Sequence, residues 1–312
     1  SKRVTIYKMK KNVLLTGGTG FIGKKLTQLL LVSGYSVSIL SRSNKANTDG
    51  ISYFQWDVDA GTIDAAAILN ADYVIHLAGE NIGAKRWTTA RKQAILDSRE
   101  KSTQLLYTTL LKTNKKLDAF ISASGVGIYG AITDEVICTE ATPAASDFLG
   151  TVCQKWEGAT ASIHDLGIRT VQIRTGLVLG KGDGVLKQLL PLFRLRLGSA
   201  IGSGKQYMPW IHVDDLCAIY IEAIKNNDMT GAYNAAITDN TTNATFSKAM
   251  AKIYGYSIWL PNVPAFLIKM ALGEMAQIIL TGRRVSSEKI EKTGFKFKFT
   301  VLEQALRNCL GK

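Results

Sequence analysis

The chain has 312 residues, of which 46% are hydrophobic and 20% are charged, and this composition predicts a globular protein with one large or two smaller well-buried domains. Lys and Arg exceed Asp and Glu by 38 − 25 = 13, a basic balance that favours anionic partners such as phosphorylated cofactors or nucleotide sugars. Nucleic acid is not favoured as a partner, because many lysines lie at segment ends without interleaved aromatic residues.

Membrane, secretory and metal-binding classes find no support in the sequence. The best apolar stretch, residues 263–280, is interrupted by Lys269 and Glu274, so no membrane-spanning segment is expected. Residues 1–8 lack the apolar core and cleavage site of a secretory signal, and Met9 is a candidate native start, so the cytoplasm is the expected compartment. The cysteines are far apart without metal-ligand spacing, which predicts reduced thiols and no metal site; they are Cys138, Cys153, Cys217 and Cys309.

The first predicted element is a strand that ends at Thr16, followed by a glycine-rich turn and a helix that starts before Lys24. This order delivers helix N–H groups to a pyrophosphate. Gly17 permits the tight turn, Gly20 lets phosphate oxygens approach the backbone, and Gly23 allows the helix to pack closely on the strand. The residues expected to bind a dinucleotide here are Gly17, Gly20, Phe21, Ile22 and Gly23.

The second predicted strand, residues 34–40, ends at Ser41, Arg42 and Ser43. A site for the unphosphorylated cofactor normally places an acidic residue here, to accept hydrogen bonds from the ribose. Hydroxyl groups and a cation suit a 2′-phosphate instead, and Arg42 can contact it through charge-assisted hydrogen bonds. We therefore expect Ser41 and Arg42 to bind cofactor and NADP(H) to be favoured over NAD(H); the alternative is that Arg42 is a solvated loop residue.

The next strands extend the same pattern. Residues 51–56 predict a third strand that ends at Asp57, residues 63–69 a short helix, and residues 73–79 a fourth strand. Alternating strands and helices predict an α/β fold with a doubly wound parallel Rossmann sheet. His76 is expected to be a neutral, hydrogen-bonded core residue. Small residues at the end of the fourth strand leave room for the nicotinamide ribose, and the further cofactor residues expected are Asp57, Leu77, Ala78 and Gly79.

A long helix over residues 89–113 and a fifth strand over residues 119–123 lead into residues 122–130, SASGVGIYG. Ser122 completes the expected cofactor residues. Ser124 and Tyr129 place hydroxyl groups at the carboxyl end of a strand, beside a glycine-rich turn, where they can polarise a carbonyl or carbinol.

With these motifs, the sequence resembles the extended short-chain dehydrogenase/reductase superfamily, through residues 16–23 (TGGTGFIG), 76–79 (HLAG), 122–130 and 211–215 (IHVDD). More narrowly, it is similar to the YfcH-like (SulA-type) family of NAD-dependent nucleotide-sugar epimerases. That similarity extends over residues 12–306 and rests on LAGE (77–80), RWT (86–88), SR (98–99), GSGKQYMPW (202–210), GEM (273–275) and RRV (283–285).

The resemblance implies two lobes with a substrate between them. Residues 1–173 plus 205–228 would form the Rossmann domain, and residues 174–204 plus 229–312 a smaller, mostly helical substrate lobe. Arg86 and Gln206 are the expected substrate contacts. In residues 211–215, Asp214 or Asp215 is expected to cap the helix that follows, with His212 bracing it.

The chain departs from the superfamily at its catalytic pair, a Tyr followed four residues later by a Lys on one helix. One alignment, favoured by Trp156-Glu157, puts Leu149 and Cys153 at the two places; the other puts Thr151 and Lys155 there. Neither supplies a phenol, and Cys153 has no evident His partner that would make it a nucleophile. The best remaining acid/base candidate is Tyr129 with Ser124, although Tyr129 can also serve only to cover the pocket.

Three functions follow as expectations. The first is an NADP(H)-binding oxidoreductase or epimerase that acts on a carbonyl or nucleotide-sugar-like small molecule. The second is a non-catalytic NADP(H)-binding sensor or scaffold, and the third is nucleic-acid binding through a basic surface. Both a monomer and a homodimer remain open.

Overall fold

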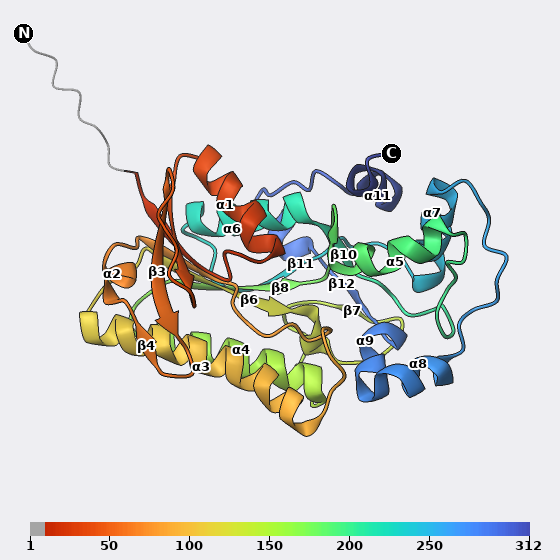
Figure 1. Ribbon diagram of the computed structural model, residues 1–312, viewed down its shortest axis with the longest axis horizontal. Helices are drawn as coiled ribbons and strands as arrows, with labels where there is room; N and C mark the ends of the chain where they lie inside the picture. Colours follow the sequence, from red (N-terminus) through yellow and green to blue (C-terminus); the bar gives the residue numbers. More distant parts are fainter. Residues whose placement is uncertain (1–9) are drawn as a thin grey trace, which may run out of the picture.

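A central sheet of eight strands organises the protein (Figure 1). The computed structural model describes residues 10–312, so the expectations about Met9 and residues 1–8 lie outside the described residues. The strand order is β11-β8-β6-β5-β1-β2-β3-β4, and every neighbouring pair is parallel except β3 with β4. The strands are β1 (Asn12–Thr16), β2 (Ser36–Ser41), β3 (Ile51–Asp57), β4 (Thr62–Ile63), β5 (Tyr73–His76), β6 (Ala119–Gly125), β8 (Thr170–Thr175) and β11 (Gly231–Ala235). This is the predicted doubly wound Rossmann arrangement, with β4 as an antiparallel edge strand that the sequence did not indicate.

Helices cover both faces of the sheet. In Figure 1, α1 (Phe21–Val32) and α6 (Val213–Lys225) lie above it, while α3 (Thr89–Thr113) and α4 (Phe148–His164) lie below it with the short α2 (Ala65–Leu69). In strand β1, successive side chains point to opposite faces of the sheet and fill the apolar core on each face. Its Val13 and Leu15 pack in the cluster with α1 and α6, and Leu14 packs in the cluster with α2 and α3. A strand buried on both faces therefore has an uninterrupted apolar sequence.

The smaller lobe lies to the right in Figure 1 and is mostly helical. Its helices α5, α7 and α11 enclose a separate apolar core that includes Phe193, Phe246 and Leu306. The remaining elements are β7 (Ile137–Cys138), β9 (Leu177–Gly180), β10 (Trp210–His212), β12 (Arg284–Val285), α5 (Gly184–Arg194), α7 (Asn243–Ile253), α8 (Ala265–Leu272), α9 (Gln277–Leu280), α10 (Glu288–Glu291), α11 (Leu302–Leu310) and the 3-10 turns η1 (Val126–Tyr129) and η2 (Gly273–Ala276). Strand β11 pairs with β8 in the main sheet, although the expected division assigns residues 229–312 to the smaller lobe.

Helix α6 is capped differently from the prediction. The Nδ1 atom of His212 accepts the backbone N–H of Asp214 at 3.0 Å, so His212 is the cap and the assignment to either aspartate is wrong. The Asp215 carboxylate instead accepts the backbone N–H groups of Lys298 (2.7 Å) and Phe299 (3.0 Å). Asp215 thus binds the C-terminal segment. Both aspartates also lie in the first turn of α6, where their negative charges interact favourably with the positive end of the helix dipole.

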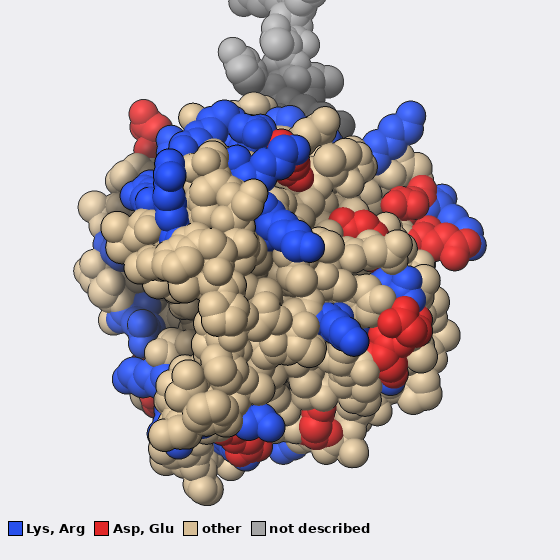
Figure 2. All heavy atoms as spheres, turned by 90° about the vertical axis from the view of Figure 1, so that its right-hand side faces the viewer, with Lys and Arg blue, Asp and Glu red and all other residues tan. Residues whose placement is uncertain are grey.

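The surface carries charges of both signs. On the face shown in Figure 2, Lys and Arg side chains are dispersed among Asp and Glu side chains, and most of the acidic ones lie on the right half. The four cysteines are free and buried, as the prediction of reduced thiols requires. Within residues 10–312, no helix has both the length and the apolar character that crossing a membrane would need.

Candidate cofactor and active site

In the turn between β1 and α1, Gly17 and Gly23 leave no room for a side chain. Gly17 has φ +67°, and its carbonyl accepts the N–H of Gly20 at 3.1 Å. A Cβ atom on Gly23 would lie 2.2 Å from that same carbonyl oxygen, so the helix can meet the turn only through glycine. On the open side, a Cβ on Gly20 would meet only the Gly17 oxygen, at 3.4 Å. Gly20 caps α1 without a side-chain hydrogen bond, which leaves helix N–H groups free for an anion.

The end of β5 is held by Thr16 and His76. The Oγ1 atom of Thr16 accepts the N–H groups of Leu77 and Ala78, each at 3.0 Å, and lies 2.6 Å from Nδ1 of His76. On the other side of the ring, Nε2 lies 3.1 Å from the hydroxyls of Ser102 and Thr103. Burial, with the charge of Arg99 as a smaller cause, lowers the pKa of His76 to about 3. His76 is therefore the neutral, hydrogen-bonded core residue that was predicted, and through Thr16 it helps to hold the backbone that follows β5.

The end of β2 presents a free cation. Ser41 is buried and accepts the N–H of Ser43 at 3.3 Å, whereas Arg42 is exposed. Among the described residues, no side-chain hydrogen bond or ion pair of Arg42 is present, so its guanidinium is available to an anion. Asp57, expected at the cofactor, accepts the N–H of Ala60 at 2.9 Å and shapes the turn after β3.

The two predicted acid/base residues belong to one buried network. The Tyr129 hydroxyl donates to Oδ1 of Asn234 at 2.6 Å and accepts from Nη1 of Arg174 at 3.1 Å. The Ser124 hydroxyl donates to Glu157 at 2.8 Å, and Glu157 pairs with Arg174. Tyr129 is only 1% exposed, and burial raises its pKa to about 12. Its hydroxyl is thus bound on both sides, which disfavours proton release at neutral pH; its acid/base role stays a prediction.

Helix α4 turns Leu149 and Cys153 toward the end of β6. The Cys153 Sγ lies 3.7 Å from the position of a Cβ on Gly125, and the Leu149 Cβ lies 3.3 Å from the corresponding position on Gly127. Lys155 is exposed and lies 3.5 Å from Glu100. Leu149 and Cys153 therefore face the end of β6, and burial raises the pKa of the Cys153 thiol to about 11.

A buried arginine on α3 is a feature to which the sequence assigned no role. Arg99 is 6% exposed, and its Nη1 donates to the backbone oxygens of Glu80 (3.1 Å) and Ile95 (3.0 Å). Its guanidinium carbon lies 4.6 Å from the centre of a Trp156 ring and 3.1 Å from where Gly79 would carry a Cβ. Gly79 thus leaves room for this guanidinium. Only the Ser98-Arg99 pair in the family motif pointed toward it.

The two expected substrate residues differ in burial and in contacts. Arg86 is exposed and packs on Gly273, where a Cβ would come within 2.8 Å of its Nε. Gln206 is 1% exposed, and its Nε2 donates to the backbone oxygens of Ile201 and Ile279, each at 3.0 Å. Gln206 therefore holds the smaller lobe together, and the substrate role of both residues stays a prediction.

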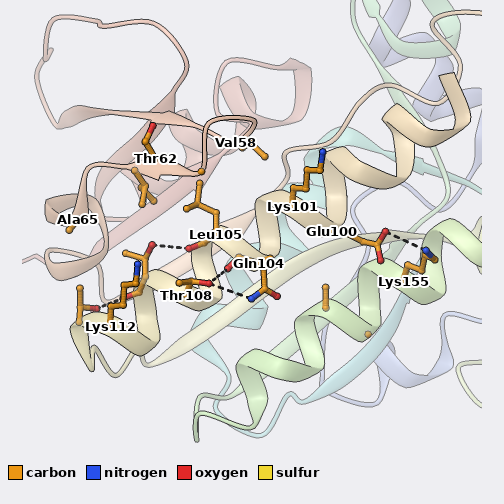
Figure 3. Close-up of a pocket in the computed structure, with 16 residues that line it drawn as sticks. Val58, Thr62, Ala65, Glu100, Lys101, Gln104, Leu105, Thr108, Lys112 and Lys155 are labelled. Atoms are coloured by element: carbon orange, nitrogen blue, oxygen red, sulfur yellow. Dashed lines mark hydrogen bonds and ion pairs between the residues drawn. The ribbon is translucent and has the colours of Figure 1, made fainter. Parts of the chain in front are cut away.

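A large open groove of about 1050 Å³ lies elsewhere, between the β3–β4 turn, α3 and α4 (Figure 3). Apolar side chains such as Leu105 line it together with polar ones, and Lys155 on α4 reaches toward Glu100 on α3 (Figure 3). None of the predicted cofactor, catalytic or substrate residues lines this groove. Within residues 10–312, no three or more His, Cys, Asp and Glu side chains gather as a metal site would need.

Comparison with known families gives two matches along the chain. The profile of the NAD dependent epimerase/dehydratase family matches residues 13–236. A domain of unknown function, DUF1731, matches residues 263–309. Together these matches cover the Rossmann sheet and most of the helical C-terminal region.

Individual relatives match along nearly their whole length. Epimerase family protein YfhF of Bacillus subtilis is 35% identical over 300 residues, covering 96% of this chain and 98% of that protein. Human epimerase family protein SDR39U1 is 34% identical over 303 residues, covering 96% and 99%.

Two solved structures share the architecture. The crystal structure of human SDR39U1 (isoform 2) with NADPH superposes with a TM-score of 0.85 at 33% identity, covering 96% of this chain and 99% of that chain. The nucleoside-diphosphate sugar epimerase of Corynebacterium glutamicum gives a TM-score of 0.78 at 31% identity, covering 97% of this chain and 59% of that chain.

Proposed function

The chain belongs to the NAD dependent epimerase/dehydratase family, and from this premise we propose that it binds NADP(H) over the β1–α1 turn and acts as an oxidoreductase or epimerase on a carbonyl or nucleotide-sugar-like substrate. Within the family it is an atypical extended short-chain dehydrogenase/reductase. The observation that carries the proposal is the turn itself. Gly23 meets the Gly17 carbonyl where no Cβ would fit, and Gly20 leaves the helix N–H groups open.

The preference for the phosphorylated cofactor rests on Arg42. Its exposed guanidinium lies just after β2. The neighbouring positions hold Ser41 and Ser43, so no acidic residue stands there to bind the hydroxyls of an unmodified ribose. An Arg beside hydroxyl groups suits the 2′-phosphate. The structure of the human relative, which holds NADPH, supports the same choice. NADP(H), when bound, supplies hydride transfer to or from the substrate.

A second candidate, an NADP(H)-binding sensor or scaffold without catalysis, is favoured by the groups around the nicotinamide end. One of the two alignments puts Leu149 and Cys153 in place of the superfamily's phenol and amine, and their position beside the end of β6 supports it. The Tyr129 phenol is buried between Asn234 and Arg174. Neither arrangement removes the cofactor turn, so both candidates predict NADP(H) binding and differ only in turnover.

The test begins with cofactor affinity. Calorimetric titration of NADPH and NADH into the wild type and Arg42→Ala should show NADPH binding more tightly to the wild type. The substitution should weaken NADPH by about tenfold or more, because a charge-assisted contact to the phosphate is lost. NADH affinity should change little. Equal weakening of both cofactors would contradict the 2′-phosphate assignment.

Turnover separates the two candidates in the same samples. The protein is incubated with NADPH and a panel of carbonyl compounds and nucleotide sugars, while absorbance and products are followed. Turnover that is lost in Tyr129→Phe would support an enzyme with Tyr129 in its chemistry. Tight NADPH binding without turnover across the panel would favour the sensor.

A further inference from the structure

The guanidinium of Arg99 is a cation buried without a counter-ion. The side chain is 6% exposed, and among the described residues no carboxylate comes within ion-pair distance of it. Its protein acceptors are two backbone carbonyls, those of Glu80 and Ile95. Burial lowers the pKa of Arg99 to about 10, which leaves it charged at neutral pH. An unpaired buried charge is costly, so its retention points to a partner outside the chain.

Two donors at this place are unsatisfied. The Nε atom of Arg99 and the Nε1 atom of Trp156 are both buried without an acceptor. They belong to side chains that stack on each other at 4.6 Å, and Trp156 is itself only 7% exposed. The Nη2 atom of Arg99 also makes no hydrogen bond within the described residues, but unlike Nε it is not fully buried. The guanidinium therefore has one edge open to an acceptor.

The open edge lies at the end of β5. A Cβ on Gly79 would lie 3.3 Å from Nη2, and Gly79 itself is exposed. In doubly wound sheets, ligands lie outside the carboxyl ends of the strands. With the pyrophosphate over the β1–α1 turn, as proposed above, Gly79 falls at the nicotinamide end, because it follows shortly after the end of β5, the neighbour of β1.

We propose that Arg99, delivered from α3, contacts the nicotinamide-riboside half of NADP(H) and takes the place of the lysine in the superfamily's catalytic pair. This assignment rests on the proposed function and makes Arg99 a cofactor-positioning residue. The acceptors available on that half are the ribose hydroxyls and the carboxamide oxygen. A planar guanidinium held between Trp156 and Gly79 is pre-oriented for such acceptors, so little side-chain freedom is lost on binding.

The test compares NADPH with adenosine 2′,5′-bisphosphate, which has the 2′-phosphate but no nicotinamide riboside. Affinities of both ligands are measured by calorimetry on the wild type, R99Q and R91Q. R91Q is the matched control because Arg91, also on α3, anchors the same loop through Glu80 (2.8 Å) and the Asn81 carbonyl (2.6 Å). R99Q should weaken NADPH by about tenfold or more and leave the bisphosphate within about twofold of the wild type. R91Q should leave the ratio of the two affinities unchanged.

The other possible results would contradict either the role of Arg99 or the proposed function. Equal weakening of both ligands by R99Q, unchanged NADPH affinity, or the same loss in R91Q would overturn the role of Arg99. A wild type that binds neither ligand would overturn the proposed function instead. If R99Q does not fold by circular dichroism, R99K serves in its place. It keeps a cation without the planar fork, and a loss confined to NADPH supports the proposal, whereas an equal loss or none contradicts it.

Discussion

At the scale of single residues, His76 owes its state to the hydroxyls around it. Thr16 accepts two backbone N–H groups, so its own hydrogen is free to be donated to Nδ1 of His76. The hydroxyls of Ser102 and Thr103 both donate to the carbonyl of Arg99, which leaves them as acceptors for Nε2. The network thus selects the neutral ring with its proton on Nε2, and a second proton would have no acceptor.

This network predicts a pH-dependent stability. The pKa of His76 in the folded protein, about 3, lies below the ordinary value of 6.5, so its contribution to stability is present above about pH 6.5 and is lost as the pH falls. Between about pH 7.5 and pH 5, the free energy of unfolding of the wild type should fall by about 2 kcal/mol more than that of His76→Gln. Urea titrations of both proteins at the two pH values measure this difference. A parallel decline would show that His76 does not titrate on unfolding as argued.

At the scale of elements, the β1–α1 unit was the part that the sequence predicted best. Its glycine spacing, its apolar strand and the following helix are local signals, and the structure places all three as expected. The apolar stretch of residues 263–280 does not form one continuous helix. It is divided into α8, η2 and α9, and Gly273 adopts φ +61° at the first break. Hydrophobicity alone did not reveal the break, because it depends on how η2 packs against the loop that carries Arg86.

The close contact between Gly23 in α1 and the Gly17 carbonyl gives a direct prediction. Gly23→Ala would force a Cβ to 2.2 Å from the Gly17 oxygen, and since backbone must move, unfolding free energy should fall by about 3 kcal/mol or more. NADPH binding should be lost with it. Gly158→Ala in α4 is the control, because a Cβ there meets nothing within 4 Å, and this change should stabilise by about 0.5–1 kcal/mol. Thermal and urea unfolding of the two variants measure both effects; similar stabilities would refute the packing argument.

The candidate site was only partly predictable, because its parts meet through packing between helices. The sequence left two alignments open on α4, and the orientation of the helix toward Gly125 and Gly127 supports the one with Leu149 and Cys153. Arg99 lies in a helix whose residues show little apolar periodicity, so nothing in its neighbourhood along the chain indicated burial. Its contacts with Gly79 and Trp156 come from elements distant in sequence.

At the scale of the whole molecule, long-range pairings join the sheet to the C-terminal region. Strand β7 pairs in parallel with β12, and β11 completes the edge of the main sheet beside β8. The sequence did not indicate the partner of β11, because strand order depends on where the chain returns after the smaller lobe. Lys92 on α3 also pairs with Glu274 in η2, so the start of α3 is tied to the same region.

The tie between β7 and β12 depends on Arg283. Its Nε donates to both carboxylate oxygens of Asp134, at 3.0 and 3.1 Å, and its Nη1 donates to the Tyr129 carbonyl at 3.1 Å. Because the side chain is only 17% exposed, Arg283→Met should lower the free energy of unfolding by about 2 kcal/mol. It should also speed amide hydrogen exchange in residues 129–138. Lys292→Met is the control, since Lys292 and its partner Glu288 are 72% and 66% exposed and such pairs contribute less than about 1 kcal/mol. If exchange accelerated equally in both variants, the Arg283 contacts would not be what joins these two segments.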